Sequence, residues 1–160
     1  MKLSLVPFRA EHRAAVSSWP RDLEEARAWA GQSMSWPVDP RTLDTWHADA
    51  DTQPRVALDG DELVAYGQLW IDREEDEVEL ARIIVDPARR NAGVGVAFVK
   101  GLVEQAARFA CARVVLRVVP GNTAAIRCYE RAAFVRLPES DQQRFNEGQP
   151  LDYVWMQHRT

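Results

Sequence analysis

Hydrophobic and polar positions recur with two different periods along the chain, and the period predicts the element at each place. Apolar residues three or four positions apart indicate helices, because such residues share one face of a helix. Runs rich in β-branched residues, or alternating between apolar and polar residues, indicate strands. We predict helices over residues 10–19, 21–30, 93–110 and 122–132. We predict strands over residues 3–9, 55–72 (as a hairpin), 77–86, 113–119, 133–137 and 151–158.

Turn signals separate these elements. Asp59-Gly60 predicts a tight turn in the hairpin of residues 55–72, since both residue types tolerate positive φ angles. Prolines interrupt residues 31–54, which we predict to be irregular apart from one or two helical turns near residues 41–48. We predict that the polar stretch 138–150 is a loop.

The order of these elements indicates the fold class. A strand and two helices precede a meander of three strands, and a helix, a strand, a helix and two strands follow. This mixture is typical of an α/β (α+β) domain. The 160 residues suffice for one well-buried core and are few for two, so we predict a single domain over residues 1–160.

Composition narrows the class of protein further. Hydrophobic residues make up 46% of the chain and charged residues 28%, as in globular proteins. No apolar run approaches the roughly 20 residues that span a bilayer, and the N-terminus lacks the apolar core of a signal peptide. We therefore expect a cytoplasmic protein with no membrane partner. The net charge of −4 argues against nucleic acid as a partner.

Acidic residues are concentrated between residues 49 and 79. Such a concentration is typical of a solvated rim, and it also attracts cations by long-range steering. Both interpretations stay open, and the second weakly favours a cationic acceptor.

Cysteines and histidines give no sign of a metal site. Cys111 and Cys128 have no C-x-x-C spacing, and the histidines lie at the distant positions His12, His47 and His158. We therefore predict reduced, buried thiols and no metal.

The segment "RRNAGVGVAF", residues 89–98, joins a predicted strand to a predicted helix. Free N–H groups at a helix start, together with the helix dipole, form an anion site. Glycines at positions 93 and 95 let the backbone approach a ligand closely, and Arg89 or Arg90 adds charge-assisted bonds. A helix cap without ligand is the alternative interpretation.

Two common phosphate-binding loops do not match this segment. A P-loop requires Lys-Ser or Lys-Thr after its last glycine, whereas Val96 and Ala97 follow Gly95. A dinucleotide-binding loop requires a third glycine, where Phe98 stands, and an acid at the end of the next strand, which "RVVLRVVPGN" lacks.

Three segments between Glu79 and Phe134 resemble the GNAT N-acetyltransferase superfamily. "RNAGVG" is similar to the superfamily's [Gln/Arg]-x-x-Gly-x-[Gly/Ala] motif for the pyrophosphate of acetyl-CoA. "IIVDPARR" before it and "NTAAIRCYERAAF" after it resemble the flanking strand and helix. The resemblance implies a GNAT-like domain, a twisted mixed sheet flanked by helices, with a splayed pair of parallel strands that binds the cofactor.

The resemblance also implies the residues that bind acetyl-CoA. The loop holds the pyrophosphate, and the backbone of the bulged strand before it pairs with the pantetheine arm and donates an amide to the thioester carbonyl. The residues implied are Ile84, Val85, Arg89, Arg90, Asn91, Ala92, Gly93, Val94, Gly95, Val96, Asn122, Ala125 and Tyr129. Asn122 is equally suited to cap its own helix, and the two roles are compatible.

Acetyl transfer from a thioester to an amine needs a deprotonated amine and a proton for the leaving thiolate. The resemblance implies Tyr129 as the general acid, with a core aromatic as the alternative. Glu77 and Glu79 leave the same face of their strand, and the superfamily places its catalytic glutamate at either register. One of the two glutamates acts as the general base, or solvent or another residue takes the proton. In the second case the two glutamates only form a charged face at the edge of the sheet.

Aromatic residues outside the motifs supply candidate contacts to the acceptor. Trp36, Trp46 and Phe145, with Asn146 beside it, fall where the superfamily builds its acceptor pocket. All four are equally compatible with a packing role.

These observations predict an N-acetyltransferase that moves an acetyl group directly from acetyl-CoA to a primary amine of a small molecule. Acetylation of protein or peptide N-termini, and a non-catalytic acyl-CoA sensor, are the alternatives. A homodimer is compatible with an exposed edge of the strand "LDYVWMQH".

Overall fold

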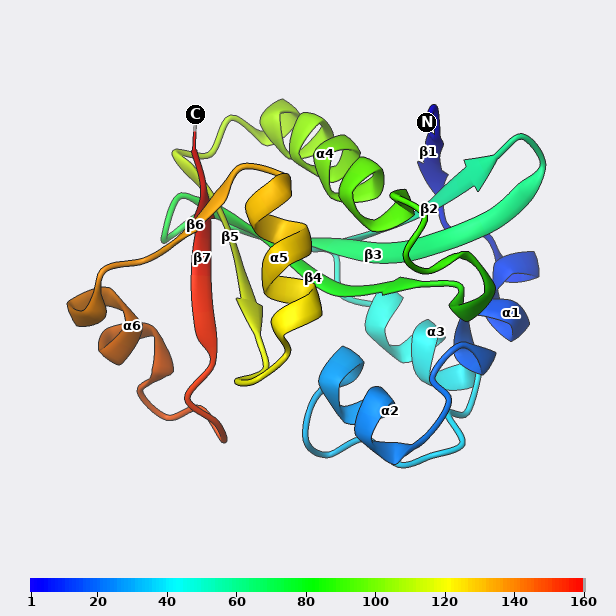
Figure 1. Cartoon of the computed structure of the whole chain (residues 1–160), viewed down its shortest axis with the longest axis horizontal. Helices are drawn as coiled ribbons and strands as arrows, with labels where there is room; N and C mark the ends of the chain where they lie inside the picture. Colours follow the sequence, from blue (N-terminus) through cyan, green and yellow to red (C-terminus); the bar gives the residue numbers. More distant parts are fainter. Residues whose placement is uncertain (160) are drawn as a thin grey trace.

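The chain folds around a seven-stranded mixed β-sheet, which a computed structural model describes for residues 1–159 (Figure 1). The strands are β1 (Ser4–Pro7), β2 (Thr52–Asp59), β3 (Glu62–Asp72), β4 (Glu77–Val85), β5 (Arg113–Val118), β6 (Phe134–Arg136) and β7 (Val154–His158). Their order in the sheet is β1-β2-β3-β4-β5-β7-β6. Only β4 and β5 pair in parallel. The predicted mixed α/β fold and the meander of β2, β3 and β4 are confirmed.

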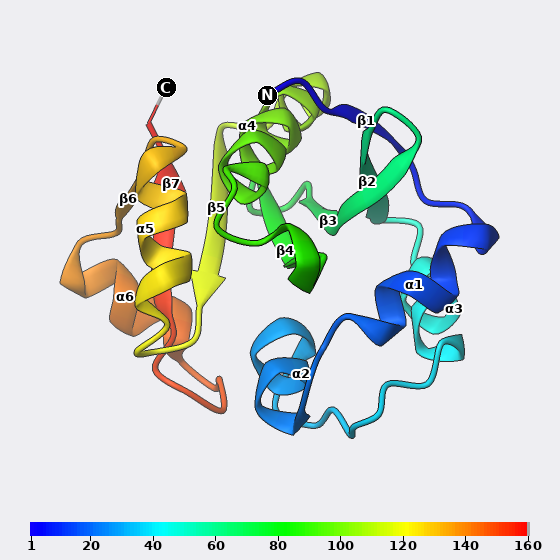
Figure 2. The same ribbon diagram turned by 45° about the vertical axis from the view of Figure 1, so that its right-hand side comes forward.

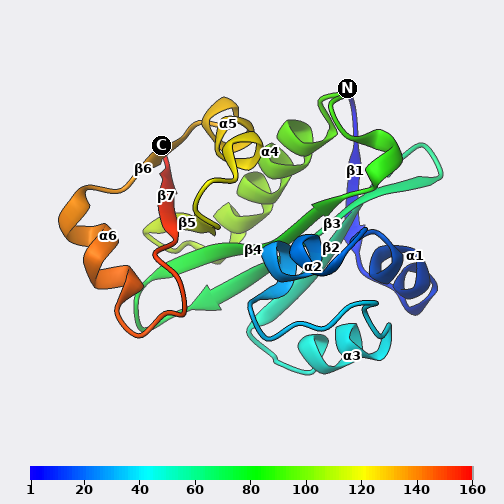
Figure 3. The ribbon, with the colours of Figure 1, turned by 60° about the horizontal axis from the view of Figure 1, so that its bottom comes forward.

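Helices cover both faces of the sheet. They are α1 (Arg13–Ser18), α2 (Leu23–Ala30), α3 (Arg41–His47), α4 (Val94–Ala106), α5 (Thr123–Arg131) and α6 (Glu139–Asn146). α4 and α5 lie side by side on one face, and α1, α2 and α3 group on the other (Figure 2, Figure 3). Adjacent side chains of β3 point to opposite faces of the sheet. Ala65 packs with α4 on one face, and Tyr66 packs with α1 to α3 on the other.

The parallel strands β4 and β5 pair only over their first residues. The pairs are Glu77 with Arg113, Val78 with Val114, and Glu79 with Val115. Beyond them β4 continues along β3 and β5 along β7, so the two strands diverge (Figure 1). The divergence leaves the β5-facing edge of residues 80–85 without a strand partner.

A β-bulge lies in β4 where the strands diverge. The register between β3 and β4 shifts between Tyr66 and Gln68, and Arg82 takes a φ of 50°. Positive φ is rare for a residue with a branched or long side chain, so surrounding contacts must hold it. One of them is the indole of Trp29, which donates to the Arg82 carbonyl at 2.7 Å.

The hairpin turn differs from the prediction by one residue. Asp59 ends β2 opposite Glu62, and the two central residues are Gly60 and Asp61. Of these, Gly60 alone has positive φ, 63°. Glycine at the first central position is the pattern of a type II′ turn, so Asp59 need not leave the extended conformation.

The stretch predicted as a polar loop contains α6, so that prediction was wrong. None of its residues is buried, which explains the missing hydrophobic period. Two side-chain amides attach it to β7 instead. Gln142 exchanges two hydrogen bonds with the backbone of Trp155, at 2.7 and 2.8 Å, and Asn146 does the same with Tyr153, at 2.8 and 3.1 Å.

The strand proposed as an exposed edge is internal. β7 pairs with β5 on one side and β6 on the other. The argument for a homodimer through this strand therefore fails, and the homodimer stays a prediction without that support. No helix within residues 1–159 is long and apolar enough to cross a membrane.

Candidate active site

The glycine loop starts α4 in the conformation that an anion site needs. Asn91 and Gly93 have φ angles of 62° and 85°, and α4 begins at Val94 directly after Gly93. The N–H groups of the first helical turn have no carbonyl four residues earlier in the helix to bond. A Cβ atom on Gly95 would lie 3.1 Å from Cys128 Sγ, so glycine there allows α4 and α5 to approach each other.

The two arginines before the loop are engaged elsewhere. Arg89 forms ion pairs with Asp59 and with Glu62, the latter at 2.6 Å. Arg90 donates to Glu25 at 3.1 Å and to the Val85 carbonyl at 3.1 Å. In this arrangement their guanidinium groups tie the loop to β2, β3 and α2, and their part in holding an anion beside the backbone N–H groups stays a prediction.

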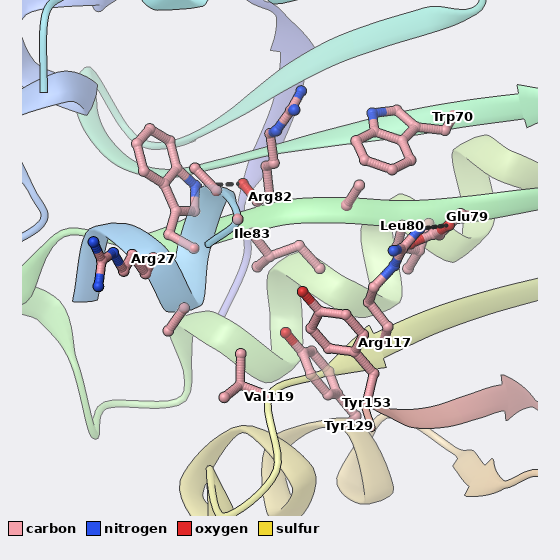
Figure 4. Close-up of a pocket in the computed structure, with 15 residues that line it drawn as sticks. Arg27, Trp70, Glu79, Leu80, Arg82, Ile83, Arg117, Val119, Tyr129 and Tyr153 are labelled. Carbon is pink, nitrogen blue, oxygen red and sulfur yellow. Dashed lines mark hydrogen bonds and ion pairs between the residues drawn. The ribbon is translucent and has the colours of Figure 1, made fainter. Parts of the chain in front are cut away.

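A pocket opens where β4 and β5 diverge, bounded by α2, α5 and Tyr153, which directly precedes β7 (Figure 4). Tyr129 and Glu79, two of the sequence-predicted catalytic residues, both line it. In Figure 4 the hydroxyl groups of Tyr129 and Tyr153 point the same way, toward β4. The lining residues are Arg27, Ala28, Trp29, Ala30, Gly31, Trp70, Glu79, Leu80, Ala81, Arg82, Ile83, Arg117, Val119, Tyr129 and Tyr153.

Tyr129 retains its phenolic proton. It projects from α5 and packs edge-on against Phe134 at 6.4 Å between ring centroids. Burial raises the pKa of the phenol well above its ordinary value, because a phenolate would lose its hydration there. A neutral phenol beside the pocket is able to donate a proton or a hydrogen bond.

The two glutamates of β4 occupy different surroundings. Glu79 is 9% exposed and accepts two hydrogen bonds from Arg117, at 2.8 and 3.0 Å. Glu77 lies outside the pocket lining and pairs with Arg113 at 2.9 Å, while burial raises the pKa of its carboxyl group. An ionised carboxylate offers about four lone-pair sites, so Glu79 still has acceptor capacity toward the pocket.

The predicted acceptor residues lie outside this pocket. Trp36 is 45% exposed and donates to the Pro20 carbonyl at 2.9 Å. Trp46 packs at 5.2 Å against Trp29, a residue of the pocket wall, and Phe145 packs at 5.1 Å against Trp155, which does not line the pocket. Asn146 is occupied by its bonds to β7.

Several lining residues were not singled out by sequence reasoning as site residues. They come from α2, β3, β4, β5 and the position just before β7, and they are Trp29, Trp70, Arg82, Arg117 and Tyr153. Arg117 shares its β5 face with Val115 and Arg113, an alternation visible in the sequence. Two of the chain's six tryptophans, Trp29 and Trp70, line the pocket. Their position depends on packing, and no sequence pattern distinguishes them from the other four.

Asn122 caps α5, as one of its two predicted roles requires. Its side-chain oxygen accepts from the Ala125 N–H at 3.2 Å. Cys111 and Cys128 are free thiols and only partly buried. Within residues 1–159 no cluster of three or more metal-ligating side chains occurs.

Apart from Glu79, the acidic residues of the segment 49–79 do not line the pocket. Asp59 and Glu62 pair with Arg89, and Glu77 pairs with Arg113. Among the described residues that line the pocket, Glu79 is the single carboxylate. The acidic segment therefore gives no local support for a cationic acceptor.

Solved structures of N-acetyltransferases share this fold. AAC(6')-Ib in complex with paromomycin and acetyl-CoA superposes with a TM-score of 0.75 at 21% identity, covering 99% of this chain and 93% of that one. The aminoglycoside acetyltransferase AAC(6')-Ib with coenzyme A and kanamycin gives 0.72 at 20% identity, covering 98% and 94%. Spermidine N-acetyltransferase from Vibrio cholerae with CoA and spermine gives 0.72 at 17%, covering 85% and 82%.

The sequence also matches a family model. The model is described as the acetyltransferase (GNAT) family, and it matches residues 18–134, from the end of α1 to the start of β6. This range contains the glycine loop, the diverging strands and Tyr129. The chain therefore belongs to the GNAT family of acetyl-CoA-dependent N-acetyltransferases.

Proposed function

We propose that this protein acetylates a primary amine of a small molecule by direct transfer from acetyl-CoA. The observation that carries the proposal is the meeting of Tyr129 and Glu79 in one pocket at the point where β4 and β5 separate. One residue can supply a proton and the other can accept one, which are the two proton transfers that the reaction requires.

The groups around this pocket are suited to bind acetyl-CoA, the acetyl donor. Bound acetyl-CoA supplies the acetyl group as an activated thioester. The unpaired edge of residues 80–85 offers backbone groups to an extended arm, and the start of α4 at Gly93 offers N–H groups to its pyrophosphate. Space above Gly93 is open, since a Cβ atom there would meet nothing within 4 Å.

Each catalytic residue then has one task. Glu79 accepts the proton that the amine loses as the carbon–nitrogen bond forms. Tyr129 donates its phenolic proton to the sulfur as the carbon–sulfur bond breaks. A backbone N–H of β4 after the bulge stabilises the charge on the carbonyl oxygen. No side chain becomes acetylated.

The kanamycin and spermine in the similar structures support a small-molecule amine over a protein N-terminus. Those ligands are bound by other proteins, and the acceptor of this protein depends on the residues that line its own pocket. A sensor domain would bind acetyl-CoA without transferring its acetyl group to any of a broad panel of amines and peptides.

The first experiment is thermal unfolding with and without acetyl-CoA. Ligand at about one hundred times its Kd adds roughly 2.7 kcal/mol to the free energy of unfolding, which raises Tm by about 5 to 10 °C. Release of thiol in the presence of amines then reports transfer. Absence of any shift in folded protein would refute acetyl-CoA binding and with it the proposed function.

Gly93→Ala and Gly148→Ala form a matched pair for this experiment. Both glycines have positive φ, 85° and 78°, and open space around a Cβ atom. Each variant should cost about 1–2 kcal/mol of stability, because alanine is strained there. Only Gly93→Ala should also reduce the acetyl-CoA shift. Equal shifts in both variants would place the pyrophosphate elsewhere.

A further inference from the structure

The proposed acceptor pocket contains two guanidinium groups that no carboxylate neutralises within residues 1–159, that of Arg27, which is exposed, and that of Arg82, which is partly buried. Arg117 pairs with Glu79, whereas Arg82 forms no ion pair with any residue in 1–159. The single polar side-chain contact of Arg82 in the part of the chain described is one N–H bond to Gln68, at 3.2 Å. Figure 4 shows its side chain beside Trp70 at the upper wall of the pocket.

Aromatic rings and the β4 bulge hold Arg82 in this position. Its guanidinium lies over the ring of Trp46, 4.0 Å from the centroid, and 5.0 Å from that of Trp70. Its backbone carbonyl is bonded by Trp29. Trp46 and Trp29 belong to α3 and α2, so Arg82 is anchored on the side opposite to α4 and the glycine loop.

A chain of hydrogen bonds fixes the orientation of Gln68, the neutral partner of Arg82. The Trp70 indole can only donate, and it donates to Gln68 Oε1 at 2.7 Å. The Gln68 amide nitrogen therefore donates to Tyr66 at 2.6 Å, and the Tyr66 hydroxyl contacts His47 at 2.9 Å. Every member of this chain already has its partner, so the network positions Arg82 without neutralising it.

The charges that face Arg82 do not compensate for it. Glu79 attracts it, but Arg117 neutralises that carboxylate and itself repels Arg82. Burial lowers the pKa of His47 and raises that of Tyr66, so both stay neutral at pH 7. A guanidinium remains charged in proteins, and most of its five N–H donors are left for a ligand.

Carboxylates satisfy this arrangement best, because their two oxygens match the planar fork of a guanidinium. We propose that Arg82 binds a carboxylate of the acceptor, so that the pocket selects amines that carry a carboxylate. The proposal rests on the proposed function and narrows its substrate class. It separates this chain from enzymes whose acceptors are polycations, such as the kanamycin and spermine of the similar structures.

The test compares amines that differ only by the carboxylate. Phenylalanine is paired with phenethylamine and tryptophan with tryptamine, because Trp70 and Tyr153 of the pocket can pack against aromatic acceptors. Lysine and cadaverine form a third, aliphatic pair. At saturating acetyl-CoA we expect the carboxylate member of at least one pair to have a kcat/KM about 10 to 100 times higher than its partner. Equal or higher values for the decarboxylated member of every pair would overturn the proposal.

Arg82→Met removes the charge and keeps a long side chain between Trp46 and Trp70. In this variant we expect the ratio within the pair to fall to about one, with the acetyl-CoA thermal shift retained. Arg108→Met is the matched control, because Arg108 is exposed and lies outside the pocket lining. A preference that survives in Arg82→Met would also overturn the proposal.

If no amine of the panel is acetylated, a measurement of ligand binding tests the proposal instead. 3-Phenylpropanoate and phenethylamine are then titrated while tryptophan fluorescence is recorded. Saturable binding of the carboxylate that Arg82→Met loses supports the proposal, and its absence overturns it. A wild-type protein that gives no acetyl-CoA shift refutes the proposed function, whereas a normal shift without carboxylate preference refutes this inference alone.

Discussion

Tyr129 and Glu79 differ in how their surroundings prepare them for proton transfer. Burial raises the pKa of the Tyr129 phenol, so the phenol stays protonated. The two oxygens of the Glu79 carboxylate accept hydrogen bonds from Nε and Nη2 of Arg117. The arginine orients the carboxylate and leaves lone pairs toward the pocket. In the proposed mechanism one proton therefore moves out of Tyr129 and another moves into Glu79.

Tyr129→Phe removes only the hydroxyl group. We expect kcat to fall about 100-fold, because general acid catalysis contributes at least that much, while the acetyl-CoA thermal shift is unchanged. Steady-state release of thiol measures kcat. A kcat equal to that of the wild type would assign the proton to water.

Glu79→Gln and Glu77→Gln separate the two candidate bases. Glutamine at position 79 still accepts one bond from Arg117 but cannot take up a proton. We expect Glu79→Gln to lower kcat by about 100-fold. Glu77→Gln, which lies outside the pocket lining, should stay within about twofold of wild type. A kcat in Glu79→Gln equal to that of the wild type would leave deprotonation of the amine to solvent.

Two elements meet at the β4 bulge, and one tryptophan connects them. Trp29 of α2 is buried and donates to the carbonyl of Arg82, a residue with positive φ. The bulge lies within the part of β4 that lines the pocket, so α2 contributes both to the pocket wall and to the backbone geometry of β4 there.

Trp29→Phe keeps an aromatic ring and removes this hydrogen bond. The unsatisfied carbonyl should lower the free energy of unfolding by about 1–3 kcal/mol, and the KM of the acceptor should rise while the acetyl-CoA shift persists. Denaturant titration and steady-state kinetics measure both effects.

Trp36→Phe is the control for this prediction. Trp36 also donates to a backbone carbonyl, that of Pro20, but it is 45% exposed and lies outside the pocket. We expect a smaller loss of stability, below about 1 kcal/mol, and an unchanged acceptor KM. A raised KM would restore Trp36 as an acceptor contact.

Charge is distributed unevenly over the whole molecule. The net charge is −4, yet the pocket lining contains three arginines, Arg27, Arg82 and Arg117, against one carboxylate, Glu79. Most acids of the central segment that form ion pairs do so with arginines outside the pocket, such as Arg89 and Arg113. The net charge of the chain and the charge of the pocket lining thus have opposite signs, and the positive charge lies at the proposed acceptor site.

Stability at alkaline pH is a further property of the whole fold. Burial raises the pKa of Tyr66 and of Tyr129 above the value of about 10 in the unfolded chain. Above pH 10 the folded state therefore binds more protons than the unfolded state, so the free energy of unfolding falls as pH rises. Burial raises the pKa of the Cys128 thiol as well, which adds a decline of the same sign from about pH 8.5.

Denaturant titrations between pH 8 and pH 11 measure this decline. Tyrosinate absorbance should develop at higher pH in the folded protein than in denaturant, and Tyr129→Phe should show a shallower fall in stability above pH 10. Coincident absorbance curves in the two states would contradict the prediction.

The sequence alone determined the local features of this protein. Glycine spacing predicted the loop before α4, alternation predicted β4 and β5, and Tyr129 followed from a motif within one helix. These features depend on the backbone preferences and periodicity of neighbouring residues, which a single chain displays directly.

Only the tertiary structure decided the rest. The pairing of Glu79 with Arg117, 38 residues apart, follows from strand register, and the bulge at Arg82 follows from packing against α2. α6 forms because two amides bond to β7, and β7 is internal because β6 returns beside it. Pocket charge therefore could not be obtained from composition, since it depends on which arginines find a carboxylate once the strands are paired.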